Sequence, residues 1–172
     1  DALRMPDPVN LYYGLLNEGE VACLFADSNA GKSIFAVQMA DYISRHRKVL
    51  YVDCELSEKQ FQLRYTSKEM GFRYVFSDNF YRAEIAPEHI GVQNYEESII
   101  KDIEAAALQT DSKIVIIDNL TYLCNSSEKG DVAELFMMKL IALKKKHFLT
   151  LLIISHTPKR NMSNPITQND IA

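Results

Sequence analysis

The sequence predicts an α/β fold, a three-layer α/β/α sandwich around a mainly parallel sheet. Short, continuously apolar runs alternate along the chain with segments of helical periodicity. That pattern is typical of parallel strands covered by helices on both faces. The clearest strand, at residues 114–117, is β-branched throughout. At about 150 residues per domain, the 172 residues predict a single domain.

The expected elements follow one another without an internal repeat. Apolar runs predict strands at residues 21–25, 49–52, 114–117 and 149–154, with weaker candidates at 74–76 and 80–82. Periodicity predicts helices at residues 34–42, 57–70, 94–109 and 131–146. Ser57 and Gln60 fit a capping box that starts the second helix, and Gly71 is expected to end it. Residues 8–18 are expected to form a helical lead-in, and residues 157–172 a loop that continues in a longer protein, so that the core is truncated at its C-terminus.

Composition and charge exclude several classes of protein. The chain is 47% hydrophobic and 24% charged, which excludes collagen, low-complexity disorder and a disulfide scaffold. A net charge of −4 argues against a nucleic-acid-binding domain that is basic as a whole. No apolar run approaches the roughly 20 residues of a membrane helix, so no membrane partner is expected. Cys23, Cys54 and Cys124 lack a C-x-x-C spacing, and we interpret them as reduced core or near-core thiols of a cytoplasmic protein.

The segment after the first predicted strand carries a phosphate-binding pattern. It reads Ala26-Asp27-Ser28-Asn29-Ala30-Gly31-Lys32-Ser33, a P-loop with Ala26 in place of the first glycine. Gly31 can adopt backbone angles closed to other residues, and successive N–H groups at the start of a helix form an anion-binding nest. Lys32 is expected to contact the β- and γ-phosphates, and Ser33 to bind Mg²⁺. The expected ATP-binding residues are Ser28, Asn29, Ala30, Gly31, Lys32, Ser33 and Ile34.

Carboxylates at two other strand ends complete the predicted chemistry. Four aliphatic residues followed by Asp118 form a Walker B pattern, in which Asp118 holds Mg²⁺. The next residue is Asn119, which cannot act as a base, so the base must come from elsewhere. Glu55, after the second strand, is the best candidate to activate a water beside the γ-phosphate, and Asp53 is its competitor.

The end of the last predicted strand supplies further candidates. His156 lies where a polar side chain can sense the γ-phosphate. Together with Lys32 and Glu55, it completes the set of expected catalytic residues. Lys159 and Arg160 follow a few residues later and are candidates for a cationic finger that reaches a neighbouring subunit's phosphate in trans.

Taken together, these residues resemble the RecA-like ATPases, and within them the RepA-type hexameric replicative helicases of plasmids and mobile elements. The match rests on Ala26 to Ser33, Glu55, Ile114 to Asp118 and His156-Thr157-Pro158-Lys159, and it spans about residues 11–159. The resemblance implies a RecA-like P-loop NTPase core that hydrolyses ATP at the subunit interfaces of a homo-oligomer, a hexamer in that branch. It also implies single-stranded DNA as a partner, with residues 120–130 and 158–170 facing a central channel.

Three functions stay open at this point. The first is a Mg²⁺-dependent ATPase motor, a helicase by resemblance, linked to replication, mobilisation or recombination of a mobile element. The second is a nucleotide-gated regulator or partner-binding module with little hydrolysis. The third is a small-molecule P-loop kinase, which would need a lid of clustered arginines, whereas Arg64, Arg73 and Arg82 are scattered. A GTPase is disfavoured because no Asn-Lys-x-Asp motif occurs, and an ABC-type ATPase because no Leu-Ser-Gly-Gly motif occurs.

Overall fold

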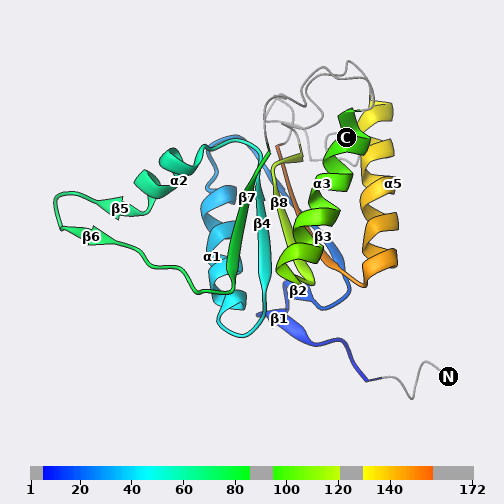
Figure 1. Ribbon diagram of the computed structural model, residues 1–172, viewed down its shortest axis with the longest axis horizontal. Helices are drawn as coiled ribbons and strands as arrows, with labels where there is room; N and C mark the ends of the chain where they lie inside the picture. The colour runs from blue at the N-terminus through cyan, green and yellow to red at the C-terminus, as the bar shows by residue number, and fades with distance from the viewer. Residues whose placement is uncertain (1–5, 86–94, 121–129, 157–172) are drawn as a thin grey trace, which may run out of the picture.

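A parallel sheet forms the centre of the computed structural model, which describes residues 6–85, 95–120 and 130–156, without the side chains of residues 130–132. Within those residues the sheet has five strands (Figure 1). Their spatial order is β3 (Val21–Ala26), β9 (Thr150–His156), β8 (Ile114–Asp118), β4 (Val49–Asp53) and β7 (Phe80–Glu84). Every pairing between neighbours is parallel, so the predicted α/β class is confirmed.

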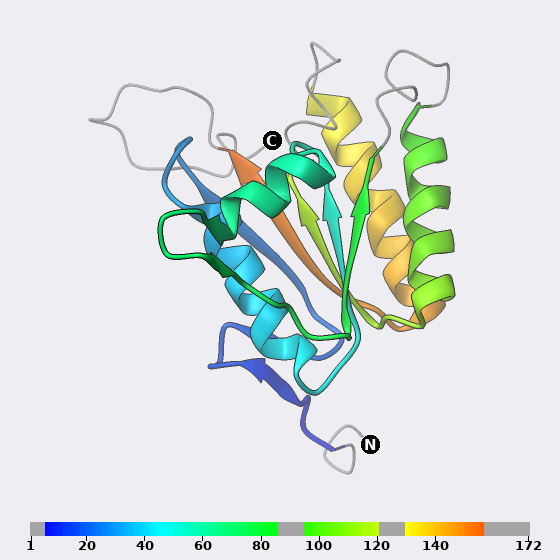
Figure 2. The ribbon, with the colours of Figure 1, turned by 60° about the vertical axis from the view of Figure 1, so that its left-hand side comes forward.

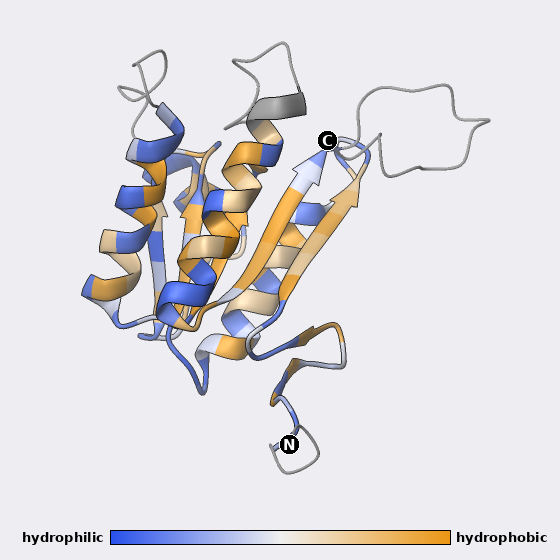
Figure 3. Ribbon diagram, turned by 90° about the vertical axis from the view of Figure 1, so that its right-hand side faces the viewer, coloured by the Kyte–Doolittle hydropathy of each residue, from blue (hydrophilic) through white to orange (hydrophobic). Residues whose placement is uncertain are grey.

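Helices cover both faces of this sheet. The helices α1 (Lys32–Ser44) and α2 (Glu58–Arg64) lie on one side, and α3 (Tyr95–Thr110) and α5 (Gly130–His147) on the other (Figures 1 and 2). Alternate residues of each central strand enter different cores. In β4, for example, Tyr51 packs with the α1 core and Leu50 with the α3 and α5 core. Burial on both faces explains why the central strands read as continuous apolar runs, as the hydropathy colouring in Figure 3 shows.

The second predicted helix is shorter than the sequence indicates. The capping box of Ser57 and Gln60 is present, but α2 ends at Arg64 rather than near residue 70. The chain then forms a hairpin of β5 (Thr66–Ser67) and β6 (Phe72–Arg73). Gly71, with φ of 60°, lies in the turn of this hairpin rather than at a helix end. Left-handed backbone is common at both places, so the glycine alone did not distinguish them. The weak strand expected at residues 74–76 is therefore wrong, whereas the one at 80–82 is β7.

The expected helical lead-in at residues 8–18 is also wrong. This segment forms a hairpin of β1 (Asn10–Tyr12) and β2 (Leu16–Asn17). Tyr13 and Gly14 connect the two strands with φ of 40° and 77°, which no α-helix can accommodate. Leu11, Tyr12 and Leu16 are buried against the α1 core.

The cysteines differ in their surroundings. Cys54 is buried, but Cys23 is exposed on the edge strand β3, contrary to the core or near-core position expected for it. Cys124 lies outside the described residues. Among the helices that the structure describes, none has the length and apolar character needed to cross a membrane.

Packing between β9 and the helices α3 and α5 can be tested by truncating Ile153, which is fully buried in that core. We expect Ile153→Ala to lower the free energy of unfolding by about 2–5 kcal/mol, through lost burial and a residual cavity. Urea denaturation measures the change. Met138→Ala is the control, because Met138 on α5 is 61% exposed and surface substitutions change stability by about 0.5 kcal/mol at most. Equal effects of the two substitutions would contradict the packing.

Candidate functional site

The carboxyl ends of four strands meet at one edge of the sheet. The parallel register places Ala26 beside His156, Ile154 beside Asp118, and Asp118 beside Asp53. Ligands of open α/β sheets bind beyond this edge. The loops that carry the sequence-predicted residues therefore converge, although they are far apart along the chain.

The P-loop joins the end of β3 to the start of α1 in a left-handed bend. Gly31 has φ of 84° and ψ of 11°, and Asn29 has φ of 63°. The α1 helix begins at Lys32, and its first turn is closed by the Phe35 N–H donating to the Gly31 carbonyl at 3.0 Å. A Cβ atom built on Gly31 would have no heavy-atom neighbour within 4 Å. Free space at a helix N-terminus suits a phosphate group.

Lys32 is held against its own loop. Its Nζ donates to the carbonyls of Ala26 at 2.6 Å and Asp27 at 2.7 Å, and the residue is only 6% exposed. Burial lowers the pKa of the Lys32 ammonium, whereas the nearby carboxylates of Asp118, Asp27 and Glu55 act in the opposite direction. A poorly hydrated cation beside an anion nest is suited to contact phosphate oxygens.

Asp118 is a buried carboxyl group at the end of β8. Its Oδ2 accepts a hydrogen bond from the Tyr51 hydroxyl at 2.5 Å, and its Oδ1 is buried without a hydrogen-bond partner among the described residues. Burial raises the pKa of Asp118, and the hydroxyls of Tyr51 and Ser33 partly oppose that shift. The unsatisfied oxygen and the Ser33 hydroxyl are hard ligands of the kind Mg²⁺ prefers, so these residues fit the expected metal.

A cavity of about 270 Å³, which we call the phosphate cavity, opens beside these groups. It is lined by Asn29, Ala30, Gly31, Lys32, Ser33, Ile34, Glu55, Arg64 and His156. The cavity thus brings most of the predicted phosphate-binding residues together with Glu55 and His156. Ser28 and Asp118 do not line it. Arg64, which the sequence showed only as one of several scattered arginines, enters from α2.

Asn119 connects the two candidate catalytic side chains. Its Nδ2 lies 3.3 Å from Glu55 Oε2, to which it donates, and 3.1 Å from His156 Nε2. Asn119 is 2% exposed, so this amide is fixed in place. The sequence indicated only that Asn119 cannot be a base. The position of an amide side chain directly after the Walker B aspartate was the one feature of the sequence that pointed to a polar contact there.

Asp53, the competitor of Glu55, makes a different set of contacts. Its Oδ2 accepts two hydrogen bonds from Arg82, at 3.1 and 2.9 Å. Its Oδ1 accepts from the backbone N–H groups of Glu55 at 3.1 Å and Leu56 at 2.8 Å. Asp53 does not line the cavity, and its hydrogen bonds commit it to holding the loop after β4.

Several predicted residues lie outside the described part of the chain. These are the finger candidates Lys159 and Arg160, and most of the two expected channel loops, residues 121–129 and 158–170. Their positions relative to the cavity therefore stay predictions.

The fold and the cavity define a P-loop nucleotide-binding domain of the ATPase type, built on a parallel sheet consistent with a RecA-like core. A family model described as an AAA domain matches residues 1–162. The chain therefore belongs to this family of P-loop ATPases. No curated protein sequence matches the chain.

The buried charge of Asp118 predicts a pH-dependent effect on stability. Because the pKa of Asp118 is raised in the folded state, ionisation of this group costs stability as the pH rises through that pKa. We expect Asp118→Asn to raise the unfolding temperature at neutral pH in metal-free buffer, where each 1 kcal/mol corresponds to roughly 2–4 °C for a chain of this size. The gain should disappear at acidic pH, where Asp118 is protonated. Thermal unfolding between acidic and neutral pH measures it.

Asp111→Asn is the matched control for this prediction, because the Asp111 side chain is 78% exposed and only 3.4 Å from Lys48 Nζ. A surface pair of this kind contributes about 0–1 kcal/mol. A destabilised Asp118→Asn protein at neutral pH would contradict the assignment of Asp118 as a desolvated carboxylate.

Proposed function

We propose that this chain is the Mg²⁺-dependent ATP-hydrolysing domain of an oligomeric motor that acts on DNA. The observation that carries the hydrolytic part is the single cavity that unites the P-loop with Glu55 and His156. A phosphate-binding loop alone supports nucleotide binding. A carboxylate in the same cavity supports activation of a water molecule.

The residues of the P-loop and of β8 bind the nucleotide. Lys32 exchanges its bonds to the Ala26 and Asp27 carbonyls for phosphate oxygens, and the backbone N–H groups around Gly31 surround the phosphates. Ser33 and Asp118 would hold Mg²⁺, which would supply neutralisation of charge on the phosphate oxygens. The hydrogen bond from Tyr51 keeps one Asp118 oxygen fixed, so the other would be available as a metal ligand.

Glu55 acts as the general base. It accepts a proton from a water molecule as the water oxygen attacks the γ-phosphorus, and the bond from that phosphorus to the bridging oxygen breaks to release ADP. Asn119 orients the Glu55 carboxylate and also contacts His156. A change at His156 on loss of the γ-phosphate therefore reaches Glu55 through one amide side chain.

The resemblance to RepA-type helicases supports the finer part of the proposal. It favours a homo-oligomer, a hexamer in that branch, in which Lys159 or Arg160 reaches the ATP of a neighbouring subunit, whereas the cytoplasmic location proposed for the protein rests on its cysteine usage. It also favours single-stranded DNA as the partner of residues 120–130 and 158–170. The negative net charge of the chain supplies no general attraction to DNA, so this part rests on the resemblance.

The direct test is Mg²⁺-dependent ATP turnover over a range of protein concentrations, with and without single-stranded DNA. Turnover per subunit that rises with protein concentration, and again with DNA, is the expected result for a site completed by a neighbouring subunit. ATP binding without turnover at every concentration would favour a nucleotide-gated regulator instead.

Substitutions at Lys32 and Glu55 separate ATP binding from hydrolysis. Lys32→Ala should weaken ATP binding by roughly 10–100-fold, the cost of losing charged hydrogen bonds of about 1.5–3 kcal/mol. Glu55→Gln should keep ATP affinity and lower kcat by about 10²–10⁴-fold, the usual contribution of a general base. Equilibrium binding and steady-state turnover measure the two effects.

The control is Glu18→Gln, an exposed carboxylate in the turn after β2, which should change neither quantity. Unchanged turnover in Glu55→Gln would remove Glu55 as the base, and unchanged ATP binding in Lys32→Ala would remove the phosphate-binding role of the P-loop.

A further inference from the structure

Arg82 lies on the edge strand β7 and reaches across the sheet edge to the loop after β4. Its Nε and Nη2 donate to Asp53 Oδ2 at 3.1 and 2.9 Å, and Nη2 also donates to the carbonyl of Leu56. The guanidinium carbon lies 4.7 Å from the centre of the Phe61 ring. The Arg82 side chain is only 13% exposed. One partly buried guanidinium therefore joins β7, β4, α2 and the connection between β4 and α2.

The connection held by Arg82 is the one that carries Glu55. Asp53 connects Arg82 to the backbone of this loop, because its second carboxylate oxygen accepts hydrogen bonds from the N–H groups of Glu55 and Leu56. The Leu56 carbonyl is bound by Arg82 directly. The backbone is thus fixed on both sides of Glu55, while the Glu55 carboxylate receives its hydrogen bond from Asn119.

We propose that Arg82 is a positioning residue for Glu55, an inference that rests on the proposed role of Glu55 in ATP hydrolysis. Arg82 does not line the phosphate cavity. It acts through Asp53 and the Leu56 carbonyl, which set the direction in which the loop presents Glu55. A displacement of about 1 Å in a reacting group can cost roughly 10²-fold in rate, so a loop without helix or strand structure needs such an anchor.

The type of side chain fits this task. A guanidinium has five N–H donors in a rigid plane, and it binds a carboxylate with two of them while stacking on an aromatic ring. A lysine ammonium cannot make the paired contact to Asp53 and the contact to Phe61 in the same geometry. A buried ion pair is by itself weak evidence for stability, so its link to Glu55 is the more specific reason for placing Arg82 there.

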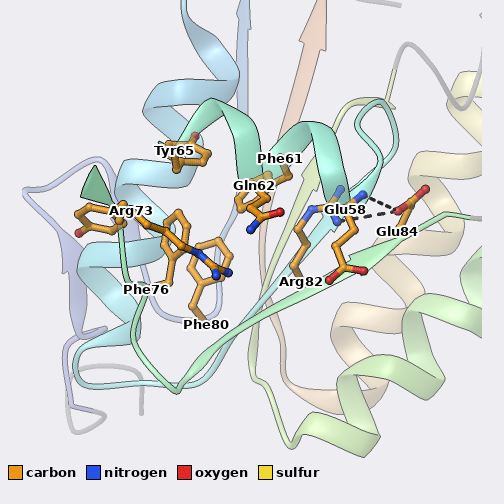
Figure 4. A pocket seen from close by; sticks show the side chains of 10 residues that line it. Glu58, Phe61, Gln62, Tyr65, Arg73, Phe76, Phe80, Arg82 and Glu84 are labelled. Atoms are coloured by element: carbon orange, nitrogen blue, oxygen red, sulfur yellow. Dashed lines mark hydrogen bonds and ion pairs between the residues drawn. The ribbon is translucent and has the colours of Figure 1, made fainter. Parts of the chain in front are cut away.

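Arg82 is accessible from a second cavity, which offers a direct test. This cavity of about 580 Å³ lies beside α2 and β7 and is lined by Glu58, Phe61, Gln62, Tyr65, Arg73, Tyr74, Phe76, Phe80, Arg82 and Glu84 (Figure 4). The phosphate cavity has a different lining and shares none of these residues. A small cation can therefore reach the place of a truncated Arg82 without entering the ATP site.

The experiment compares Arg82→Ala with the wild type in Mg²⁺-dependent ATP turnover. We expect kcat to fall by about 10–100-fold, while ATP affinity changes by less than about 3-fold, under 0.7 kcal/mol. Low-millimolar guanidinium, far below denaturing concentrations, should restore part of kcat in Arg82→Ala. Asp53→Asn should lower kcat in the same way. Guanidinium should not restore it, because Arg82 is still present and the carboxylate that it binds is the group that has changed.

Arg73→Ala is the matched control, since Arg73 lines the same cavity and makes no contact with the Glu55 loop that the structure records. It should keep wild-type kcat. An unchanged kcat in Arg82→Ala would overturn the proposal. So would a loss of kcat that guanidinium does not relieve and that accompanies weaker ATP binding, because that is the pattern of a general structural defect.

Amide hydrogen exchange gives a readout that needs no turnover. Exchange at Glu55 and Leu56 should be faster in Arg82→Ala than in the wild type, and unchanged in Arg73→Ala. Equal exchange in Arg82→Ala and the wild type would overturn the proposal that Arg82 holds the loop that carries Glu55. An inactive wild type would overturn the proposed function, and the exchange data keep that result distinct from failure of the proposal for Arg82.

Discussion

The site depends on the in-register parallel pairing of β3, β9, β8 and β4. Because neighbouring strands run in one direction, their polar terminal residues lie at one edge, with Asp118 opposite Asp53 and His156 opposite Ala26. β9 lies between β3 and β8, so His156 is placed between the P-loop and Asn119. A slip of one residue in β8 would turn its side chains to opposite faces and bring Ile117 or Asn119 to the place of Asp118.

Placing this site at the end of an apolar core requires burial of polar groups. Lys32, Asp53, Asp118 and Asn119 are each less than 10% exposed, and unpaired polar groups at such depth are costly. Most of the cost is offset by specific partners, such as Arg82 for Asp53 and Tyr51 for Asp118. Asp118 Oδ1 has no hydrogen-bond partner among the described residues. Binding sites commonly trade stability for an unsatisfied group that a ligand then satisfies.

The sequence predicted what depends on local pattern. Continuous apolar runs located all the central strands, and the spacing from Ala26 to Ser33 located the P-loop, because phosphate binding requires a fixed local order of residues. Glycine was ambiguous: Gly71 was compatible with a helix end or a hairpin turn, and it lies in the turn between β5 and β6. The contacts of Arg82 to Asp53 and of Asn119 to Glu55 were not predicted, since they span 29 and 64 residues and no local pattern pairs these side chains.

The geometry at Glu55 is determined from the outer edge of the sheet as much as from the P-loop. α2 has seven residues and none of them is buried, so a helix this short owes its place to contacts rather than to its own propensity. Those contacts are aromatic: Phe61 lies 5.6 Å from Phe76, which stacks at 4.7 Å on Phe80 of β7. The same helix carries Arg64 into the phosphate cavity. Phe61 and Arg64 lie on the same short helix, so packing around Phe61 positions Arg64 in the phosphate cavity as well as the loop that carries Glu55.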